Sequence, residues 1–234
     1  MSLAPADHHG DAPPIRRKAM RVVAVFSEKG GSGKSTLSIH LAGMAARGHK
    51  VLLVDADAQG TVESWGAART RPEPLVVRAD TANISEVLSA ARQEGFELVL
   101  VDCPPRAVAG TAVILRLVDH VVTPVQATMP DILAAQRTVA LAAAAGKPLS
   151  FVINRAPARA VEVVQAREVL ERAGPVSPVT IGDRRAFARS LTESLSVNEY
   201  ARDAAKAVEE IFRYWLWLDS HHWEIETCQR RQAA

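Results

Sequence analysis

Residues 22 to 36 read VVAVFSEKGGSGKST, and this stretch decides the fold of the chain. Its first five residues are apolar and predict a buried strand, and the glycines predict a loop whose backbone can approach an anion closely. Lys34 and Ser35 then open an alanine- and leucine-rich segment with helical spacing. A strand, a glycine-rich loop and a helix N-terminus in this order form a cage of backbone N–H groups for phosphate. Lys34 would reach the terminal phosphates, and the Ser35 hydroxyl would hold a magnesium ion.

The loop departs from the standard phosphate-binding pattern at two positions. Glu28 occupies the usual first glycine position, and Lys29 stands directly before the glycine pair. The segment KGGSGKS at 29–35 resembles the deviant Walker A box of the ParA/MinD family of partition and positioning ATPases. This resemblance implies a homodimer that sandwiches ATP and Mg²⁺, in which Lys29 reaches the phosphates bound by the partner subunit. The nucleotide contacts that it implies at the loop are Lys29, Gly30, Gly31, Ser32, Gly33, Lys34, Ser35 and Thr36.

Two apolar strands are expected to end in aspartates beside this loop. The strand at 51–54 leads into Asp55 and Asp57, and the strand at 96–101 leads into Asp102. The carboxyl ends of parallel strands are where α/β sheets bind ligands. An apolar strand that ends in Asp is the Walker B pattern, so we expect Asp102 to hold Mg²⁺. The family resemblance implies that Asp55 supports the magnesium shell and that Asp57 orients or activates the attacking water, with Lys29 and Lys34 as its catalytic partners.

The cysteines argue against a rival interpretation. The iron protein of nitrogenase shares the fold of this family and holds an iron–sulfur cluster between subunits, which requires two well-placed cysteines in each chain. Cys103 and Cys228 are the two cysteines of the sequence, and Cys228 lies near the C-terminus. We therefore reject the cluster and interpret Cys103 as a small buried residue. Two cysteines offer no disulfide framework and fit a reducing cytosol.

An Asn–Arg pair follows the predicted strand at 149–153. Asn154 and Arg155 resemble the end of the strand that contacts adenine in the family. An amide can satisfy donor and acceptor edges of the base, and a guanidinium can stack on it. Strand capping by Asn154 is the alternative.

The C-terminal part of the chain resembles the closing pattern of the family. A short strand is expected at 178–181, followed by a basic cluster and a final helix at 198–219 that buries Ile211, Phe212 and Trp215. In the family, a basic surface in this region binds double-stranded DNA without sequence preference. We expect this contact from Arg184, Arg185 and Arg189, whose phosphate contacts would read no bases. The alternative is a solvated basic helix face.

Composition and patterning suit one α/β domain, a doubly wound and mostly parallel sheet with helices on both faces. The chain has 234 residues, enough for a sizeable core, and a net charge of only +2, so DNA contact requires a local patch.

We expect a disordered arm at 1–19, the ATPase domain at 20–218 and a tail at 219–234. The arm is too short for a helix-turn-helix domain. In this respect the chain resembles the small ParA type, which lacks that domain. The tail has few aliphatic residues, which favours a partner or dimer contact over membrane insertion.

The resemblance implies a cytoplasmic, nucleoid-associated ATPase with slow intrinsic hydrolysis. The function expected first is segregation of a plasmid or chromosome, with a centromere-binding ParB-like adaptor that stimulates hydrolysis. Three alternatives remain: an ATPase that positions a protein cargo on the nucleoid, a MinD-like membrane-associated ATPase, and a metabolic relative of the dethiobiotin synthetase kind. The identity of the cargo would distinguish the first alternative and ATP-dependent liposome binding the second. A substrate pocket without DNA binding would indicate the third.

Overall fold

A six-stranded sheet forms the centre of the molecule in the computed structural model, which describes residues 19–106 and 110–232, with side chains up to residue 220. All neighbouring strands pair in parallel, in the order β3-β2-β4-β1-β5-β6. Every residue of β2, β4 and β5 is buried, as the apolar runs predict for strands covered on both faces. The strands are β1 (Arg21–Val25), β2 (Val51–Asp55), β3 (Leu75–Arg78), β4 (Leu98–Asp102), β5 (His120–Val125) and β6 (Leu149–Ile153).

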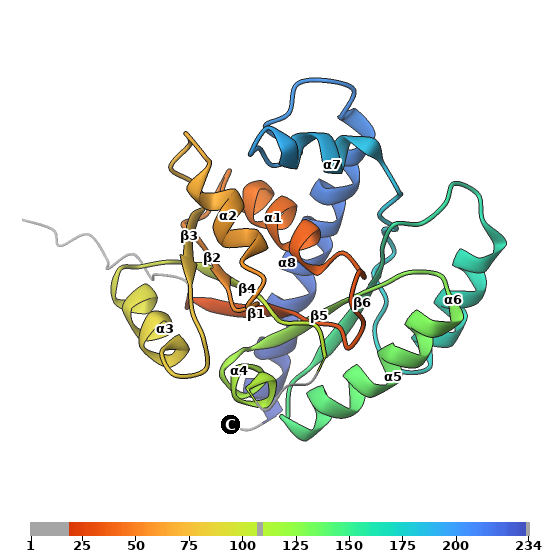
Figure 1. Cartoon of the computed structure of the whole chain (residues 1–234). Helices are drawn as coiled ribbons and strands as arrows, with labels where there is room; N and C mark the ends of the chain where they lie inside the picture. Colours follow the sequence, from red (N-terminus) through yellow and green to blue (C-terminus); the bar gives the residue numbers. More distant parts are fainter. Residues whose placement is uncertain (1–18, 107–109, 233–234) are drawn as a thin grey trace, which may run out of the picture.

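Helices cover both faces of the sheet, so the predicted doubly wound fold is confirmed (Figure 1). One face carries α1, α2, α7 and α8, and the other carries α3, α4 and α5, with α6 beside α5 and β6. Alternate residues of β1 enter the two cores, Val23 and Val25 one and Val22 and Ala24 the other. The helices are α1 (Lys34–Ala45), α2 (Thr61–Ala67), α3 (Ile84–Gln93), α4 (Thr111–Leu117), α5 (Met129–Ala144), α6 (Val161–Glu171), α7 (Arg185–Thr192) and α8 (Ala205–Gln232).

The register of the sheet brings the acidic strand ends together. Asp102 at the end of β4 is paired with Val25 of β1 on one side and with Asp55 of β2 on the other. The phosphate loop follows Val25 directly, because β1 ends there. Three separate segments of the sequence therefore converge at one point on the carboxyl edge of the sheet.

Two predicted elements at the C-terminal end were wrong. The segment at 178–181 is not a strand of the sheet. Isolated bridges flank it instead, one from Val176 to Phe151 of β6 and one from Gly182 to Ala156, which lies after β6. The final helix begins at Ala205 rather than at 198, because Glu199 binds back to the backbone N–H of Ser196 at 2.7 Å and closes a separate turn.

The long helix α8 buries Ile211 and Trp215 as the sequence pattern predicts, but the prediction for Phe212 was wrong. Phe212 is 43% exposed, whereas Tyr214 is fully buried against the sheet. The helix continues through Gln232, past the expected domain boundary at 219. The expected disordered arm lies outside the described residues except for its last residue, Ala19. In the part of the chain that the structure describes, none of the helices has the length and apolar character needed to cross a bilayer.

Candidate functional site

The glycine-rich loop turns sharply between β1 and α1 because two of its glycines adopt left-handed backbone conformations. Gly31 has φ of 77° and Gly33 has φ of 90°, which L side chains rarely adopt. A Cβ at Gly33 would lie 2.4 Å from Asn154 Nδ2, so only glycine fits there. The helix begins at Lys34, and its first backbone hydrogen bond runs from Leu37 to Gly33 at 2.9 Å. The N–H groups ahead of that bond remain free to bind an anion.

Lys34 lies at the centre of the converging segments. It is buried, and its ammonium donates to the carbonyl oxygen of Lys29 at 3.3 Å. Burial lowers the pKa of Lys34, while the carboxylates of Asp102 and Asp57 oppose this shift. The lysine is thus held between these two aspartates and the loop, where its ammonium could also donate to a terminal phosphate.

Asp102 and Ser32 each leave a buried oxygen atom unsatisfied. Ser38 donates to Asp102 Oδ1 at 3.0 Å, but Asp102 Oδ2 and Ser32 Oγ have no hydrogen-bond partner among the described residues. Burial raises the pKa of Asp102 to about 7, and the neighbouring hydroxyls of Ser35 and Ser38 oppose this shift. Buried polar atoms without partners are rare, and they point to a bound group. A carboxylate oxygen and the Ser35 hydroxyl beside it fit a hydrated magnesium ion, whose charge would favour ionised Asp102.

The aspartates after β2 differ in their surroundings. Asp55 is fully buried, and its two oxygens accept from the backbone N–H groups of Asp57 at 3.0 Å and Glu63 at 2.7 Å. Burial raises the pKa of Asp55, and these hydrogen bonds oppose the shift. Asp55 therefore holds two segments in place: the turn at 55–57, which we call the acidic turn, and the first turn of α2. Asp57 is only partly buried, and its carboxylate accepts from Gln59 N at 3.0 Å. Its role towards water and that of Asp55 towards Mg²⁺ stay predictions.

Residues at the start of α5 anchor the loop, and the sequence analysis missed them. The Lys29 ammonium forms an ion pair with the buried Asp131 carboxylate, which also accepts from Thr128 Oγ1 at 2.5 Å. Gln126 Nε2 donates to Gly31 O at 2.8 Å. Thr128 is the N-cap of α5, so the Thr-x-x-Asp pattern at 128–131 is the signal that could have located this anchor. In this structure Lys29 contacts its own chain, and its expected contact across a dimer stays a prediction.

A cavity of about 340 Å³ opens beside the loop, where adenine is expected. Its lining includes Gly33, Thr36, Asn154, Arg155 and Phe187. Asn154 is buried and donates to Ser32 O at 2.9 Å. Its amide thus braces the loop rather than only capping β6, and the predicted adenine contact of both residues stays a prediction.

The three expected DNA-binding arginines do not share one environment. Arg184 is bound to Glu210 of α8 through two hydrogen bonds, at 2.8 Å from Nε and 2.5 Å from Nη2. Arg185 and Arg189 are exposed on α7. They line a surface hollow of about 380 Å³ together with the exposed Arg202 and Lys206, which the sequence analysis missed. We call Arg185, Arg189, Arg202 and Lys206 the basic face.

Comparison with known proteins supports the interpretation of these motifs. Residues 23–197 match the model of the CobQ/CobB/MinD/ParA nucleotide binding domain. The chain is 33% identical over 197 residues to "Maintenance of carboxysome distribution protein A" of Gloeobacter kilaueensis, an alignment that covers 82% of this chain and 91% of the relative. It is 33% identical over 141 residues to "Chromosome-partitioning ATPase Soj" of Thermus thermophilus, covering 47% of this chain and 57% of that one.

A solved structure supports the fold independently. The McdA–ATP complex of Cyanothece superposes with a TM-score of 0.69 at 15% identity, covering 85% of this chain and 95% of that one. At this identity the superposition bears on the fold alone. It agrees with the parallel sheet and helix layers described above.

Proposed function

Because the chain belongs to the CobQ/CobB/MinD/ParA family of nucleotide-binding domains, we propose that it is a magnesium-dependent ATPase that positions a cargo over DNA. ATP with Mg²⁺ is the cofactor pair of ParA/MinD relatives, and the unsatisfied oxygens of Asp102 and Ser32 fit it. When bound, the nucleotide supplies a phosphoanhydride to be hydrolysed. Lys34 and the loop would hold its phosphates, and Asp57 would orient water.

One observation carries the DNA-binding part of this proposal. The basic face gathers four exposed cations around one hollow, in a chain whose net charge is only +2. Asp183 and Asp203 also line the hollow, but the four cations outnumber these two carboxylates. Such a local patch neutralises phosphates without reading bases, which suits transient attachment to any stretch of DNA.

A homodimer would complete the site. Lys29 is 35% exposed although its ammonium is paired with Asp131, so a second subunit can reach it. In the proposed ATP-bound state, Lys29 leaves Asp131 and contacts the phosphates held by the partner subunit. The contact of Lys29 with the phosphates would replace its contact with Asp131. Dimerisation would then depend on the presence of the terminal phosphate.

The choice of cargo follows from the extent of the similarity. The carboxysome distribution relative aligns with 82% of this chain, whereas the partitioning ATPase Soj aligns with 47%. This favours a protein assembly over a plasmid or chromosome as cargo, the reverse of the order expected from the sequence. The stimulating partner would then be an adaptor on the assembly rather than a centromere-binding protein. Chromosome or plasmid partition is the second candidate, which the Soj similarity supports.

The first test is binding to a random-sequence DNA duplex with ATP or with ADP, across a salt series, for the wild type and for Lys29→Ala. We expect binding that requires ATP, weakens steeply with salt and is lost in Lys29→Ala. Absence of ATP-dependent binding at low salt would contradict the proposal. Liposome binding that requires ATP and residues after 219 would instead support the MinD-like alternative.

The second test distinguishes the two cargoes. The gene is deleted in its own host, and protein assemblies and replicons are imaged in the same cells. Clustering of a protein assembly with normal replicon inheritance would support cargo positioning. Replicon loss with evenly spaced assemblies would favour partition.

A further inference from the structure

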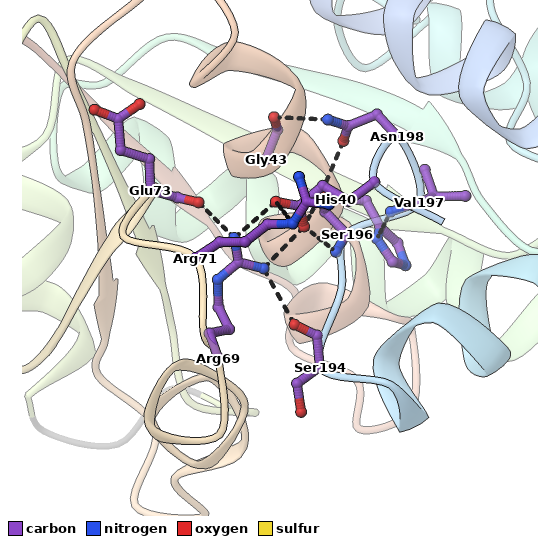
Figure 2. A network of polar contacts seen from close by, with 10 residues as sticks. His40, Gly43, Arg69, Arg71, Glu73, Ser194, Ser196, Val197 and Asn198 are labelled. Atoms are coloured by element: carbon purple, nitrogen blue, oxygen red, sulfur yellow. Dashed lines mark hydrogen bonds and ion pairs between the residues drawn. The ribbon is translucent and has the colours of Figure 1, made fainter. Parts of the chain in front are cut away.

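A turn at 194–199 is joined by hydrogen bonds to α1 and to Arg69, which follows α2 (Figure 2). The turn follows α7 directly and contacts α1 at two points. Val197 N donates to His40 Nδ1 at 3.1 Å, and Asn198 Nδ2 donates to Gly43 O at 3.1 Å. The approach is so close that a Cβ at Gly43 would lie 2.3 Å from Ser196 Oγ. The turn therefore packs closely against the helix that begins with Lys34.

Arg69 ties the same turn to α2. Its guanidinium donates to both carboxylate oxygens of Glu199, at 2.9 and 2.8 Å, and to the carbonyl oxygen of Ser194 at 3.2 Å. Its side chain is only 2% exposed and lies over the ring of Trp65, with 4.3 Å between Cζ and the ring centroid. The Glu199 carboxylate also accepts from Ser196 N and Oγ, both at 2.7 Å.

The surroundings of Glu199 favour its charged form. Burial raises the pKa of Glu199, but the hydrogen bonds from Arg69 and Ser196 outweigh it and lower the pKa overall. A buried ion pair is commonly no more stabilising than apolar side chains of the same size, although it fixes one geometry. Arg69 Nε is buried without a hydrogen-bond partner in the described structure. Stability alone is therefore a weak reason for this arrangement.

The other end of α2 lies at the acidic turn of the nucleotide site. Asp55 Oδ2 binds the N–H of Glu63 in the first turn of α2, and Asp55 Oδ1 binds the N–H of Asp57. The helix is only seven residues long and ends two residues before Arg69. If the acidic turn moved, the short helix α2 would therefore transmit the displacement to Arg69.

The turn is also continuous with the end of α7. Ser194 O, which Arg69 binds, lies two residues after the end of α7, and Phe187 of α7 packs against His40 with ring centroids 5.0 Å apart. Two residues of the basic face, Arg185 and Arg189, lie on α7. A shift of the turn would therefore move these cations relative to Arg202 and Lys206.

We propose that Arg69 and Glu199 are positioning residues that couple the nucleotide state to DNA affinity, by linking α2 to the turn that holds α7. This inference rests on the proposed function, because it requires binding of DNA that depends on ATP. In the proposed mechanism, neither Arg69 nor Glu199 contacts the nucleotide or the DNA. The pair transmits the position of the acidic turn to the basic face.

The test replaces the pair with apolar side chains, Arg69→Met with Glu199→Leu, which removes the link without leaving an unpaired buried charge. The matched control is Arg78→Met with Glu63→Leu, because this ion pair of 2.8 Å also involves α2 but is exposed. For each protein, the dissociation constant for duplex DNA is measured with ATP and with ADP, together with ATP affinity and Tm.

We expect the ATP-over-ADP preference for DNA to fall roughly fivefold or more in the Arg69/Glu199 variant, the range of ordinary coupling between sites. ATP affinity should stay within about twofold of the wild type, and the control should keep its full preference. A folded Arg69/Glu199 variant with an unchanged preference would overturn the inference.

If the double variant does not fold, Glu199→Gln provides a second test, because it removes the countercharge of Arg69 and weakens the link, while keeping a side chain that Ser196 can bind. The same fall in preference would support the inference, and an unchanged preference would overturn it. A wild-type protein without ATP-dependent DNA binding would overturn the proposed function and the inference together. A wild type with that dependence and an unaffected variant would overturn the inference alone.

Discussion

Ser38 donates a 3.0 Å hydrogen bond to one carboxylate oxygen of Asp102, and the other oxygen of Asp102 has no partner in the described part of the chain. The serine lies on α1 and the aspartate at the end of β4, so the contact ties the helix after the phosphate loop to the strand beside it. It orients the carboxylate and leaves the other oxygen free of protein partners among the described residues, which suits the proposed contact with a metal-bound water. The pKa of this buried group, raised to about 7, makes the arrangement sensitive to pH.

Magnesium should therefore stabilise the nucleotide complex less at pH 6 than at pH 8. In the folded protein Asp102 holds a proton below about pH 7, and this proton must leave before the carboxylate can serve a cation. The measurement is the rise in Tm that Mg²⁺ adds in the presence of ADP. Asp102→Asn corrects for titration of the nucleotide itself, and an equal pH dependence in wild type and variant would contradict the prediction.

His40 should make the folded state sensitive to acid. Burial lowers its pKa to about 3, so it stays neutral in the folded protein while the unfolded chain binds a proton below about pH 6.5. The unfolded state then binds more protons between these values, and stability falls as pH decreases through this window. The free energy of unfolding should be about 2 to 3 kcal/mol lower at pH 4.5 than at pH 7 from this group.

The control for this prediction is His40→Asn, whose amide oxygen can accept from Val197 N in place of Nδ1. Denaturant unfolding at several pH values should show a flatter acid limb for the variant than for the wild type. Parallel acid limbs would assign the acid sensitivity to other groups.

Gly33→Ala should weaken nucleotide binding roughly tenfold or more, since a left-handed L residue is strained by about 1–2 kcal/mol. Its Cβ would in addition meet Asn154 Nδ2 at 2.4 Å, which displaces the amide that braces the loop. Titration with a fluorescent ATP analogue provides the measurement. Gly48→Ala is the matched control, because a Cβ there meets nothing within 4 Å and should leave the affinity unchanged.

Arg185→Ala and Arg189→Ala should weaken DNA binding and each lower the slope of log affinity against log salt by about 1. Arg184→Ala should change that slope less, because its guanidinium is bound to Glu210, and should instead lower stability by about 0.5–1 kcal/mol. The exposed Arg92 on α3 provides the control substitution, Arg92→Ala. An Arg184 variant that loses as much DNA affinity as the Arg185 variant, at unchanged Tm, would contradict this assignment.

The sequence alone determined the centre of this protein. The strand, glycine loop and helix at 22–36 are local, and their order and residue types are sufficient for a phosphate site. The apolar runs that end in Asp55 and Asp102 predicted buried parallel strands, and the sheet register then placed these two carboxylates side by side. Such patterns can be read from the sequence because they depend only on residues that are close together along the chain.

Only the tertiary structure decided how distant side chains pair. Arg184 was indistinguishable from Arg185 in the sequence, and its pairing with Glu210 arises because α8 passes beside the start of α7. The partners of Lys29 and Arg69, Asp131 and Glu199, lie more than a hundred residues away. Which opposite charge a long side chain meets depends on the packing of whole helices, and no periodicity along the chain records that choice.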